Sequence, residues 1–332
     1  MRRKRHCSES SVNRNTSGFL FVSFRETIRW KEERWLTFPA YCRKTFGRKL
    51  YRIPLDIGCT CPVRDGAIDT RGCIFCAGGS GDFAVAYTGQ KLSGQDIEPF
   101  CSRDAYGSCI AYFQAYTNTY EPVEKLKPLF SAALADDMFA GISVATRPDC
   151  MPEEIMAVFK ELKEAYPDKF IWVELGLQSM HEKSAVWMRR GYSTPVYEDC
   201  VQRLHELNIQ VITHIIIGLP DESRQDLLET IAYLNRIGTD GVKLQLLHIL
   251  RGTDLAAEYN AGKVRALERV EYIDLVIDCL THLNENIVIH RLTGDGSPDI
   301  LEAPLWSRAK RSVLNEIGHE MKVRDLHQGC AL

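Results

Sequence analysis

The chain has 332 residues, of which 45% are hydrophobic and 26% charged, and its formal net charge is -3. These fractions exclude a disordered or low-complexity protein, and no apolar run approaches the roughly 20 residues of a transmembrane helix. The length suits one large α/β domain with an appendage, or two ordinary domains. The unusual quantity is the count of 12 cysteines, which indicates either disulfide bonds or a metal site.

Charge is distributed unevenly along the chain. Residues 1–60 carry 14 Lys+Arg against 5 Asp+Glu, so an acidic body follows a basic start. Residues 1–34 show no sustained helical or strand period, and their short apolar run 18–24 is poorly flanked for a secretory signal. Three interpretations remain: a flexible basic extension, a misassigned start codon, or a targeting or RNA-binding arm. We predict that residues 1–34 lie outside the fold.

From residue 51 onward, strand-like and helix-like segments alternate. The apolar, strand-like runs are residues 51–57, 110–116, 139–145, 170–177, 211–219 and 242–250. The amphipathic, helix-like segments are residues 122–134, 152–166, 196–207 and 221–236. In two of them a proline, Pro122 or Pro152, stands where the first helical turn is expected. In the segment 152–166 the apolar side chains recur at three- and four-residue spacing, which is typical of one helix face.

Buried strands that alternate with crossover helices predict parallel β/α units, and six such repeats indicate a full or partial β/α barrel. In a barrel of this kind, chemistry takes place at the C-terminal ends of the strands. We predict a barrel domain over residues 35–265. Residues 266–332 are predicted to form a helix-rich extension around a strand at residues 286–292.

Four cysteines fall close together just after the first predicted strand: Cys59, Cys61, Cys73 and Cys76. The other eight are scattered, and those in apolar stretches, such as Cys200 and Cys279, are interpreted as small buried hydrophobic residues. A long chain with strong apolar periodicity is not a disulfide scaffold. We therefore predict a reducing, cytoplasmic environment and a metal or redox site at the cluster.

Thiolates bind both zinc and iron–sulfur centres, so two kinds of site remain open on spacing alone. Four cysteines could close a structural zinc site. Three thiolates on a 4Fe-4S cluster would instead leave one iron open for a small molecule. The position after the first barrel strand favours the second interpretation, because that loop lies over the mouth of a catalytic barrel.

The segment from Leu55 to Cys76 resembles the radical S-adenosylmethionine (SAM) superfamily, and in particular its YhcC-like group, which is related to the radical SAM subunit of Elongator. That group has eleven residues between its first two cluster cysteines and two between the second pair, and Cys61, Cys73 and Cys76 match this spacing. Two residues depart from the pattern: Cys59 stands where a non-cysteine residue is usual, and Val63 where asparagine is usual. The resemblance covers roughly residues 36–330, including the stretches 113–120, 146–149, 174–178, 218–220 and 290–295.

The resemblance implies a partial (β/α)6 TIM-like barrel of the radical SAM type with a C-terminal helix-rich extension. It implies that Cys61, Cys73 and Cys76 bind a 4Fe-4S cluster whose open iron chelates SAM. Reductive cleavage of SAM would give a 5′-deoxyadenosyl radical, with the electron supplied by a donor such as a flavodoxin or ferredoxin. The hard chemistry then belongs to the cofactor, while the protein supplies orientation.

The resemblance also implies a set of SAM-binding residues: Gln114, Tyr116, Asn118, Gln178, Arg190 and His214. The first three replace a glycine-rich turn at the end of the second strand. Gln178 and His214 match positions that face the ribose, and Arg190 matches one that pairs with the carboxylate, for which a guanidinium fork is suited. Each also has a purely structural interpretation, such as a polar strand end or a core histidine. No residue is assigned to the substrate radical.

The substrate class stays open. The relation to Elongator makes tRNA base modification one option, but the acidic body does not favour extended phosphate contact. Two further functions remain as alternatives, a zinc-stabilised four-cysteine binding module and an electron-transfer iron–sulfur protein. Iron, sulfide and zinc content, and the response to SAM, distinguish the three.

Overall fold

The computed structural model describes residues 33–78, 83–101, 107–294 and 296–332. Most of the predicted basic extension therefore lies outside the described residues. Its last two residues, Glu33 and Arg34, are placed, and the Arg34 guanidinium pairs with Asp325 at 2.8 Å. In the described part of the chain, none of the helices has the length and apolar character to cross a membrane.

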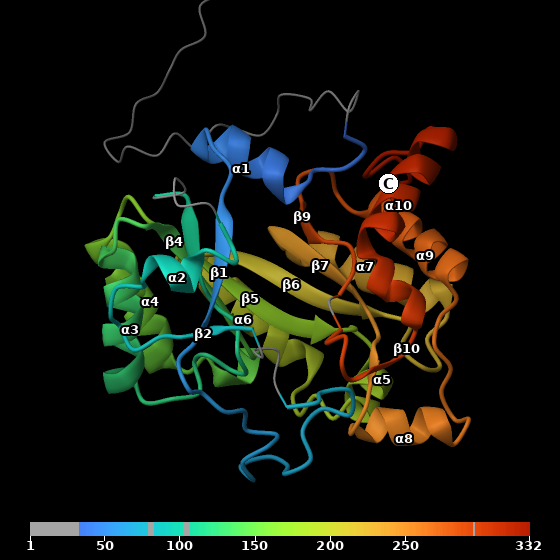
Figure 1. The fold of residues 1–332 in the computed structure, drawn as a ribbon, viewed down its shortest axis with the longest axis horizontal. Helices are drawn as coiled ribbons and strands as arrows, with labels where there is room; N and C mark the ends of the chain where they lie inside the picture. Colours follow the sequence, from blue (N-terminus) through green and yellow to red (C-terminus); the bar gives the residue numbers. More distant parts are fainter. Residues whose placement is uncertain (1–32, 79–82, 102–106, 295) are drawn as a thin grey trace, which may run out of the picture.

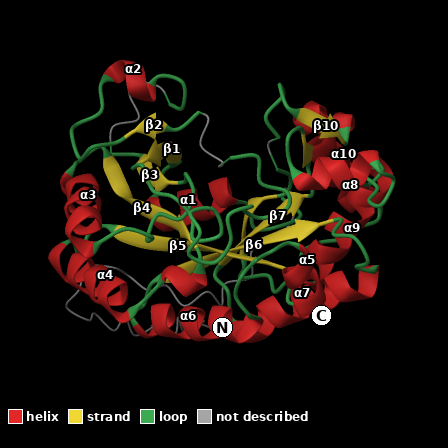
Figure 2. Cartoon of the chain, turned by 90° about the horizontal axis from the view of Figure 1, so that it is seen from below, coloured by secondary structure: helices red, strands yellow, loops and turns green. Residues whose placement is uncertain are grey.

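Eight parallel strands form the central sheet (Figure 1), in the spatial order β2-β1-β3-β4-β5-β6-β7-β9. The strands are β1 (Tyr51–Asp56), β2 (Val85–Ala86), β3 (Cys109–Phe113), β4 (Phe139–Thr146), β5 (Phe170–Gln178), β6 (Gln210–Ile217), β7 (Gly241–Leu246) and β9 (Val288–Arg291). The sheet curves into an open arc with helices along its outer side (Figure 2). The predicted partial (β/α)6 barrel is therefore confirmed, with β1 and β3 to β7 as its six strands.

The outer layer contains the four predicted helices, which are α3 (Val123–Ala135), α4 (Glu153–Ala165), α6 (Thr194–Glu206) and α7 (Arg224–Ile237). The expected place of two prolines was wrong by one residue. Pro122 and Pro152 are the N-cap residues of α3 and α4, with extended ψ angles of 144° and 171°. The N-cap position is non-helical, so a proline with its fixed φ fits there without losing a hydrogen bond.

The remaining elements are shorter or lie toward the chain ends. They are α1 (Phe38–Phe46), α2 (Gly94–Ile97), η1 (Pro148–Cys150), α5 (Glu182–Trp187), β8 (Ile249–Leu250), α8 (Asp254–Asn260), α9 (Arg269–His282), β10 (Leu301–Ala303), η2 (Leu305–Ala309) and α10 (Lys310–Val323). Strand β9 of the C-terminal segment pairs with β7, so this segment contributes an edge strand to the barrel sheet. Helix α9 packs on α7, and α10 packs on α9.

The two edges of the arc are joined at its N-terminal end by side chains. Arg52 of β1 donates to Nδ1 of His290 on β9 at 2.6 Å. The ring of Phe38 from α1 lies 3.9 Å from the Arg52 guanidinium and 5.0 Å from the His290 ring. Phe38 also packs edge-on against Trp172, whose side chain is fully buried. Helix α1 thus closes the end of the barrel opposite to the cysteine loop.

Candidate functional site

The three predicted cluster ligands lie in the long loop between β1 and β2. The carbonyl oxygen of Cys61 accepts the backbone N–H of Arg64 at 2.8 Å, which forms a tight turn directly after the first ligand. The N–H of Cys76 donates to the carbonyl of Cys73 at 3.0 Å, so the second pair also sits in a turn. Cys61, Cys73 and Cys76 are all partly exposed. The loop therefore presents three accessible thiols at the C-terminal end of the sheet.

Arg64 connects the start of this loop, after Cys61, to the second cysteine pair. Its Nη2 donates to the carbonyl oxygen of Cys76 at 2.5 Å. Gly72 lies against the same guanidinium, and a Cβ there would stand 3.1 Å from it. Gly72 also has a φ of 74°, which disfavours any side chain. The close approach of Arg64 to the second cysteine pair thus depends on a glycine at position 72.

The thiols share one electrostatic neighbourhood with two arginines. Burial raises the pKa of the Cys73 thiol to about 12, and the thiols of Cys76 and Cys61 act in the same direction. The guanidinium groups of Arg147 and Arg64 act in the opposite direction, because a nearby cation favours the thiolate. Three sulfur ligands with two cations beside them suit an anionic thiolate-bound centre.

Cys59 differs from its three neighbours. It is 6% exposed and belongs to the main hydrophobic core with Ile57 and Tyr87. Burial raises the pKa of its thiol to about 12, with Glu121 acting in the same direction. Cys59 therefore packs as a small hydrophobic residue, as do the fully buried Cys200 and Cys279.

The spacing of the sulfurs also bears on the kind of centre. A tetrahedral zinc with thiolates at about 2.3 Å needs sulfur atoms about 3.8 Å apart. Histidine, cysteine, aspartate and glutamate side chains can all bind a metal. Among the described residues, three of them bring their ligand atoms within 4.8 Å of one another only at His181, Asp226 and Glu229, and not at the four loop cysteines. The loop is therefore not arranged as a closed zinc site.

A second hydrophobic cluster anchors the cysteine loop to the barrel. Ile74, between Cys73 and Cys76, is 3% exposed and packs in a cluster with Met188 and Ile216. Its N–H donates to the carbonyl of Met188 at 3.2 Å, and its carbonyl accepts the N–H of Leu255 at 3.0 Å. Ile74 thus fixes the second cysteine pair to the segment that follows α5 and to the first turn of α8.

The three candidate residues after β3 have different environments. Gln114 donates its backbone N–H to Leu55 at 3.2 Å, beside β1. Tyr116 has a φ of 58° and donates its hydroxyl to the carbonyl of Gly78 in the cysteine loop. Asn118 is fully buried, and its Nδ2 donates to the carbonyls of Phe113 and Ala145 at 3.0 and 2.9 Å. Its Oδ1 is buried without a hydrogen-bond partner.

Gln178, at the end of β5, lies over a glycine. A Cβ on Gly176 would stand 2.3 Å from Nε2 of Gln178, so the amide occupies the space that a side chain at position 176 would fill. Gln178 has a φ of 62°, and its Oε1 is buried without a partner. Asn118 and Gln178 therefore present two unpaired acceptors at the strand ends, where a polar ligand can satisfy them.

Arg190 is buried at 2% exposure and uses its whole guanidinium on the protein. Its five donations go to the carbonyls of Tyr192, Leu177 and Ser179, the hydroxyl of Thr194 and the carboxylate of Glu182. The guanidinium has five N–H groups, so a bound carboxylate would have to displace one of these acceptors. In this structure Arg190 fixes the backbone that follows β5.

A second arginine, Arg147, lies nearer to the cysteines. It pairs with Asp149 through two hydrogen bonds, from Nε at 2.9 Å and Nη2 at 2.7 Å. The Tyr192 ring lies between the two guanidinium groups, 4.9 Å from Arg147 and 4.8 Å from Arg190. The hydroxyl of Tyr192 donates to the carbonyl of Gly176. These contacts connect Arg147, which follows β4, to the end of β5.

His214 lies in the middle of β6 and not at its end. Its Nε2 is 2.7 Å from Oε2 of Glu174, a carboxylate that Lys243 and Tyr112 also contact. The sequence analysis did not single out Glu174, Lys243 or Tyr112 as functional. The available signal was a charged residue inside each of two apolar strands, because lysine and glutamate are rarely buried unless paired.

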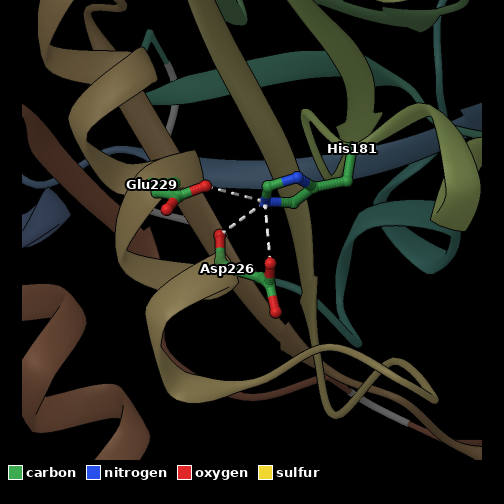
Figure 3. Close-up of side chains that lie close together, drawn as sticks. All are labelled: His181, Asp226 and Glu229. Atoms are coloured by element: carbon green, nitrogen blue, oxygen red, sulfur yellow. Dashed lines mark hydrogen bonds and ion pairs between the residues drawn. The ribbon is translucent and has the colours of Figure 1, made fainter.

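Outside the barrel, His181 meets the first turn of α7 (Figure 3). Its Nε2 lies 2.9 Å from the main-chain oxygen of Asp226 and 3.9 Å from the carboxylates of Asp226 and Glu229. Asp226 already caps α7, because its Oδ2 accepts the N–H and hydroxyl of Ser223. The hydrogen bond from His181 to the helix backbone joins the start of α5 to α7, which is a structural role.

Comparison with known proteins places this fold and loop in a family. The model of the radical SAM superfamily matches residues 70–234, and that of the radical SAM C-terminal domain matches residues 239–323. YtqA of Bacillus subtilis is 40% identical over 90% of this chain and 92% of its own length. YhcC of Escherichia coli K12 is 30% identical over 87% of this chain and 92% of its own length.

The chain therefore belongs to the radical SAM superfamily, and within it to the group that contains YhcC and YtqA. Among solved structures, it is similar to the archaeal Elp3 of Methanocaldococcus infernus, with a TM-score of 0.56 and 15% identity. That match covers 66% of this chain and 55% of the Elp3 chain, and it concerns the fold. The family resemblance inferred from the cysteine spacing is confirmed.

The residues present fit the cofactors that this family implies. The donor set is three accessible thiols with Arg64 and Arg147 beside them. Soft thiolates are the ligands of iron–sulfur clusters. The unpaired acceptors Asn118 Oδ1 and Gln178 Oε1 lie at the C-terminal ends of β3 and β5, which β4 separates. Polar groups that carry N–H or O–H donors can satisfy them.

Proposed function

We propose that this protein is a radical SAM enzyme in which Cys61, Cys73 and Cys76 bind a 4Fe-4S cluster. The observation that carries the proposal is the loop after β1, where three accessible thiols lie beside Arg64 and Arg147 at the C-terminal end of the barrel. The cluster and SAM, when bound, supply a 5′-deoxyadenosyl radical by one-electron reductive cleavage. Everything else in the reaction depends on how this chain holds the reactants.

Each remaining candidate except His214, which lies in the middle of β6, has a proposed role in holding or enclosing SAM. Gln114, Tyr116 and Gln178 lie at strand ends beside the cysteine loop and are proposed to bind SAM directly. The buried Asn118 links β3 to β4 and offers its free Oδ1. Arg190 is proposed to shape the site through the backbone that it fixes, since its N–H groups are already engaged.

The cations beside the thiols have an electrostatic role in this proposal. A thiolate-bound cluster is anionic, and Arg64 and Arg147 lie close enough to affect the Cys73 thiol. Fixed positive charge near a cluster stabilises its reduced form, because reduction adds a negative charge. The electron is proposed to come from a small redox protein such as a flavodoxin or ferredoxin.

Anaerobic purification followed by iron, sulfide and zinc analysis tests the proposal. We expect about four irons and four sulfides per chain, an absorption spectrum that dithionite bleaches, and 5′-deoxyadenosine formation from SAM. Cys61→Ser should lose the cluster, whereas the matched variant Cys59→Ser should keep it, because Cys59 lies in the core.

Other results of the metal and sulfide analysis would identify one of the two alternative functions. One tightly bound zinc and no response to dithionite would establish the four-cysteine binding module. A cluster whose spectrum ignores SAM would establish an electron-transfer protein. If Cys59→Ser loses the cluster and Cys61→Ser keeps it, the ligand assignment is wrong.

The substrate is proposed to bind inside the barrel, on the side of SAM away from the cysteine loop. The distant relation to Elongator makes a tRNA base one candidate substrate, and a small molecule is the other. Comparison of metabolites and modified nucleosides between a deletion strain and its parent would separate them, since the missing product belongs to one pool or the other.

A further inference from the structure

Five barrel strands send side chains into one buried polar network on the concave face of the sheet. They are Tyr112 of β3, Ser143 of β4, Glu174 of β5, His214 of β6 and Lys243 of β7. Glu174 is the centre: its Oε2 accepts from Tyr112 at 3.0 Å, from His214 at 2.7 Å and from Lys243. Its Oε1 accepts from Ser143 at 2.9 Å. A carboxylate with four donors is fully satisfied and stays ionised.

Stability alone does not account for this network. Taking a lysine and a glutamate out of water costs several kcal/mol per ion, and well-packed apolar side chains of similar volume are often as stable or more stable. The side chains of Glu174 and Lys243 are 0% and 2% exposed. Buried titratable groups with strongly shifted pKa values are common at functional sites. The network therefore calls for a role in the reaction.

His214 is the member of the described network that reaches open space, with a side chain 21% exposed. Because Nε2 faces the Glu174 carboxylate, it carries the proton, and Nδ1 carries the lone pair. Nδ1 accepts a hydrogen bond from the side-chain amide of Gln245 at 3.2 Å. Gln245 is partly exposed, so its amide can turn away and free Nδ1.

The β5 side of the His214 ring, where Nε2 lies, is polar. Gly176 pairs with His214 across β5 and β6 and places no side chain there. The Gln178 amide lies over this glycine, with its Oε1 buried and without a partner. A molecule that replaces the Gln245 amide would meet the lone pair of His214 on Nδ1. A lone pair accepts a hydrogen bond, so the site selects a ligand that carries a donor.

We propose that the substrate carries a hydroxyl or N–H group that replaces the Gln245 amide on Nδ1 of His214, and that His214 takes up its proton during the reaction. This inference rests on the proposed radical SAM function. The substrate O–H or N–H bond breaks heterolytically, its electron pair stays on the oxygen or nitrogen, and the proton bonds to Nδ1. Glu174 remains ionised and holds the Nε2–H. Glu174 and Lys243 are positioning residues.

The electrostatics of the free protein hold the His214 ring neutral, and the Glu174 carboxylate is the group that favours a proton on it. Burial lowers the pKa of His214 to about 4, and the Lys243 ammonium and Arg291 guanidinium act in the same direction, while Glu174 opposes them. His214 is therefore neutral at neutral pH, and its lone pair is available to a substrate. An imidazole that gains a proton next to Glu174 is stabilised by that carboxylate, as in other carboxylate–histidine pairs.

The first test reads the proton position directly and needs neither cluster nor SAM. Long-range proton–nitrogen NMR of the metal-free, full-length protein with labelled histidines gives the tautomer, and His214→Gln assigns the signal. We expect Nε2–H with an unprotonated Nδ1 from neutral pH to about pH 5. Glu174→Gln should give a mixture of tautomers. A proton on Nδ1, or a charged ring at neutral pH, overturns the proposal.

The second test reads the reaction. The probe is the small-molecule fraction or the total RNA of a cell extract, added to reconstituted protein with SAM and dithionite. His214→Gln keeps a donor for Glu174 but lacks Nδ1, and it should lower extract-stimulated 5′-deoxyadenosine formation about a hundredfold. The matched control is His205→Gln, which alters a second histidine–carboxylate pair, with Asp240, outside the network. It should leave the stimulated rate unchanged.

The two proposals fail in different ways. If the wild type with an assembled cluster forms no 5′-deoxyadenosine, the proposed function is wrong. If the wild type is stimulated and His214→Gln is stimulated equally, the role of His214 is wrong and the radical SAM function stands. A shift in the pH profile of the stimulated rate in Glu174→Gln supports the positioning role, because a merely structural carboxylate would change the amount of folded protein and not the profile.

Discussion

At the scale of single residues, a side chain's free donors decide whether it can bind a ligand. Arg190 donates to five protein acceptors, among them the main-chain carbonyls of Leu177 and Ser179 at the C-terminal end of β5. A lysine has three donors on a flexible stem and cannot reproduce the planar fork. Removing the fork would leave buried carbonyls without partners.

We therefore expect Arg190→Lys to lower the free energy of unfolding by about 2–4 kcal/mol, from one or two buried acceptors left unpaired. Urea denaturation measures it. The control is Arg189→Lys, whose ion pair with the half-exposed Asp254 should contribute about 1 kcal/mol or less. If Arg190→Lys unfolds like the wild type but binds SAM much more weakly, Arg190 is a direct ligand of the SAM carboxylate.

His214 makes a prediction about stability and pH. Its pKa is lowered by burial to about 4, whereas an unfolded histidine titrates near 6.5. Below about pH 6.5 the unfolded chain binds a proton that the folded protein does not. The stabilisation is therefore complete above that pH and is lost as the pH falls toward 4. Glu174, whose pKa is also lowered despite its burial, adds a similar loss at still lower pH.

Between pH 7 and pH 5, the wild type should lose about 2 kcal/mol more unfolding free energy than His214→Gln, which has nothing to titrate at this site. Urea titrations of both proteins at the two pH values give the difference. If the unfolding free energies of the two proteins change equally with pH, the pKa of His214 is the same in the folded protein as in the unfolded chain.

At the scale of helices and strands, apolar periodicity predicted the six strands of the barrel and helices α3, α4, α6 and α7, because both faces of a parallel strand are buried. Helix α1 was not predicted. Its residues Phe38 and Tyr41 are buried against Trp172, which is distant in the sequence, so their burial depends on the folded barrel. The strand at 286–292 was predicted, but its pairing with β7 depends on chain-distant neighbours.

The cysteine loop has little regular structure, so one apolar side chain carries much of its attachment. Ile74→Ala removes packing against Met188 and Ile216. We expect a loss of about 2–4 kcal/mol in unfolding free energy, the usual range for a buried isoleucine. We also expect lower iron retention, because Cys73 and Cys76 flank this residue.

Iron content after gel filtration and urea denaturation measure the two effects together. Ile68→Ala is the matched control, because Ile68 lies in the same loop but is 49% exposed. It should retain both iron and stability. If Ile74→Ala loses stability but keeps all its iron, the anchor matters to the fold and not to the site.

At the scale of the whole molecule, the sequence located the cysteine loop but not the interior of the barrel. Cys61, Cys73 and Cys76 could be proposed as ligands from the sequence because metal-ligand spacing is local in the chain. The network around Glu174 was not found, because its members come from five strands and each one looks like an isolated polar residue in an apolar run. Convergence of side chains from separate strands is a property of the closed arc.

The ends of the described chain are joined at the buried side chain of Gln328, which is 1% exposed, and by the ion pair between Arg34 and Asp325. Oε1 of Gln328 accepts the N–H of Leu36, just before α1, at 2.9 Å. Its Nε2 donates to the carbonyls of Asn284 and Ile287, in the turn before β9, at 2.7 and 2.9 Å. The C-terminal segment thus fixes both α1, which closes the barrel end, and β9, which forms its edge.

Gln328→Ala should therefore destabilise α1 and β9, which lie far from position 328 in the sequence. It leaves the N–H of Leu36 and the carbonyl of Ile287 without partners, while the Asn284 carbonyl keeps the N–H of Ile287. We expect a loss of about 2–4 kcal/mol at 1–3 kcal/mol for each buried group, reduced where water enters. Hydrogen exchange should show faster exchange in α1 and β9 and unchanged protection in β4 and β5, since only the edges of the arc lose support. Cys330→Ala, at an exposed position in the same segment, is the control. Uniformly faster exchange across all strands would mean that the barrel opens as one unit and that Gln328 does not hold its edges separately.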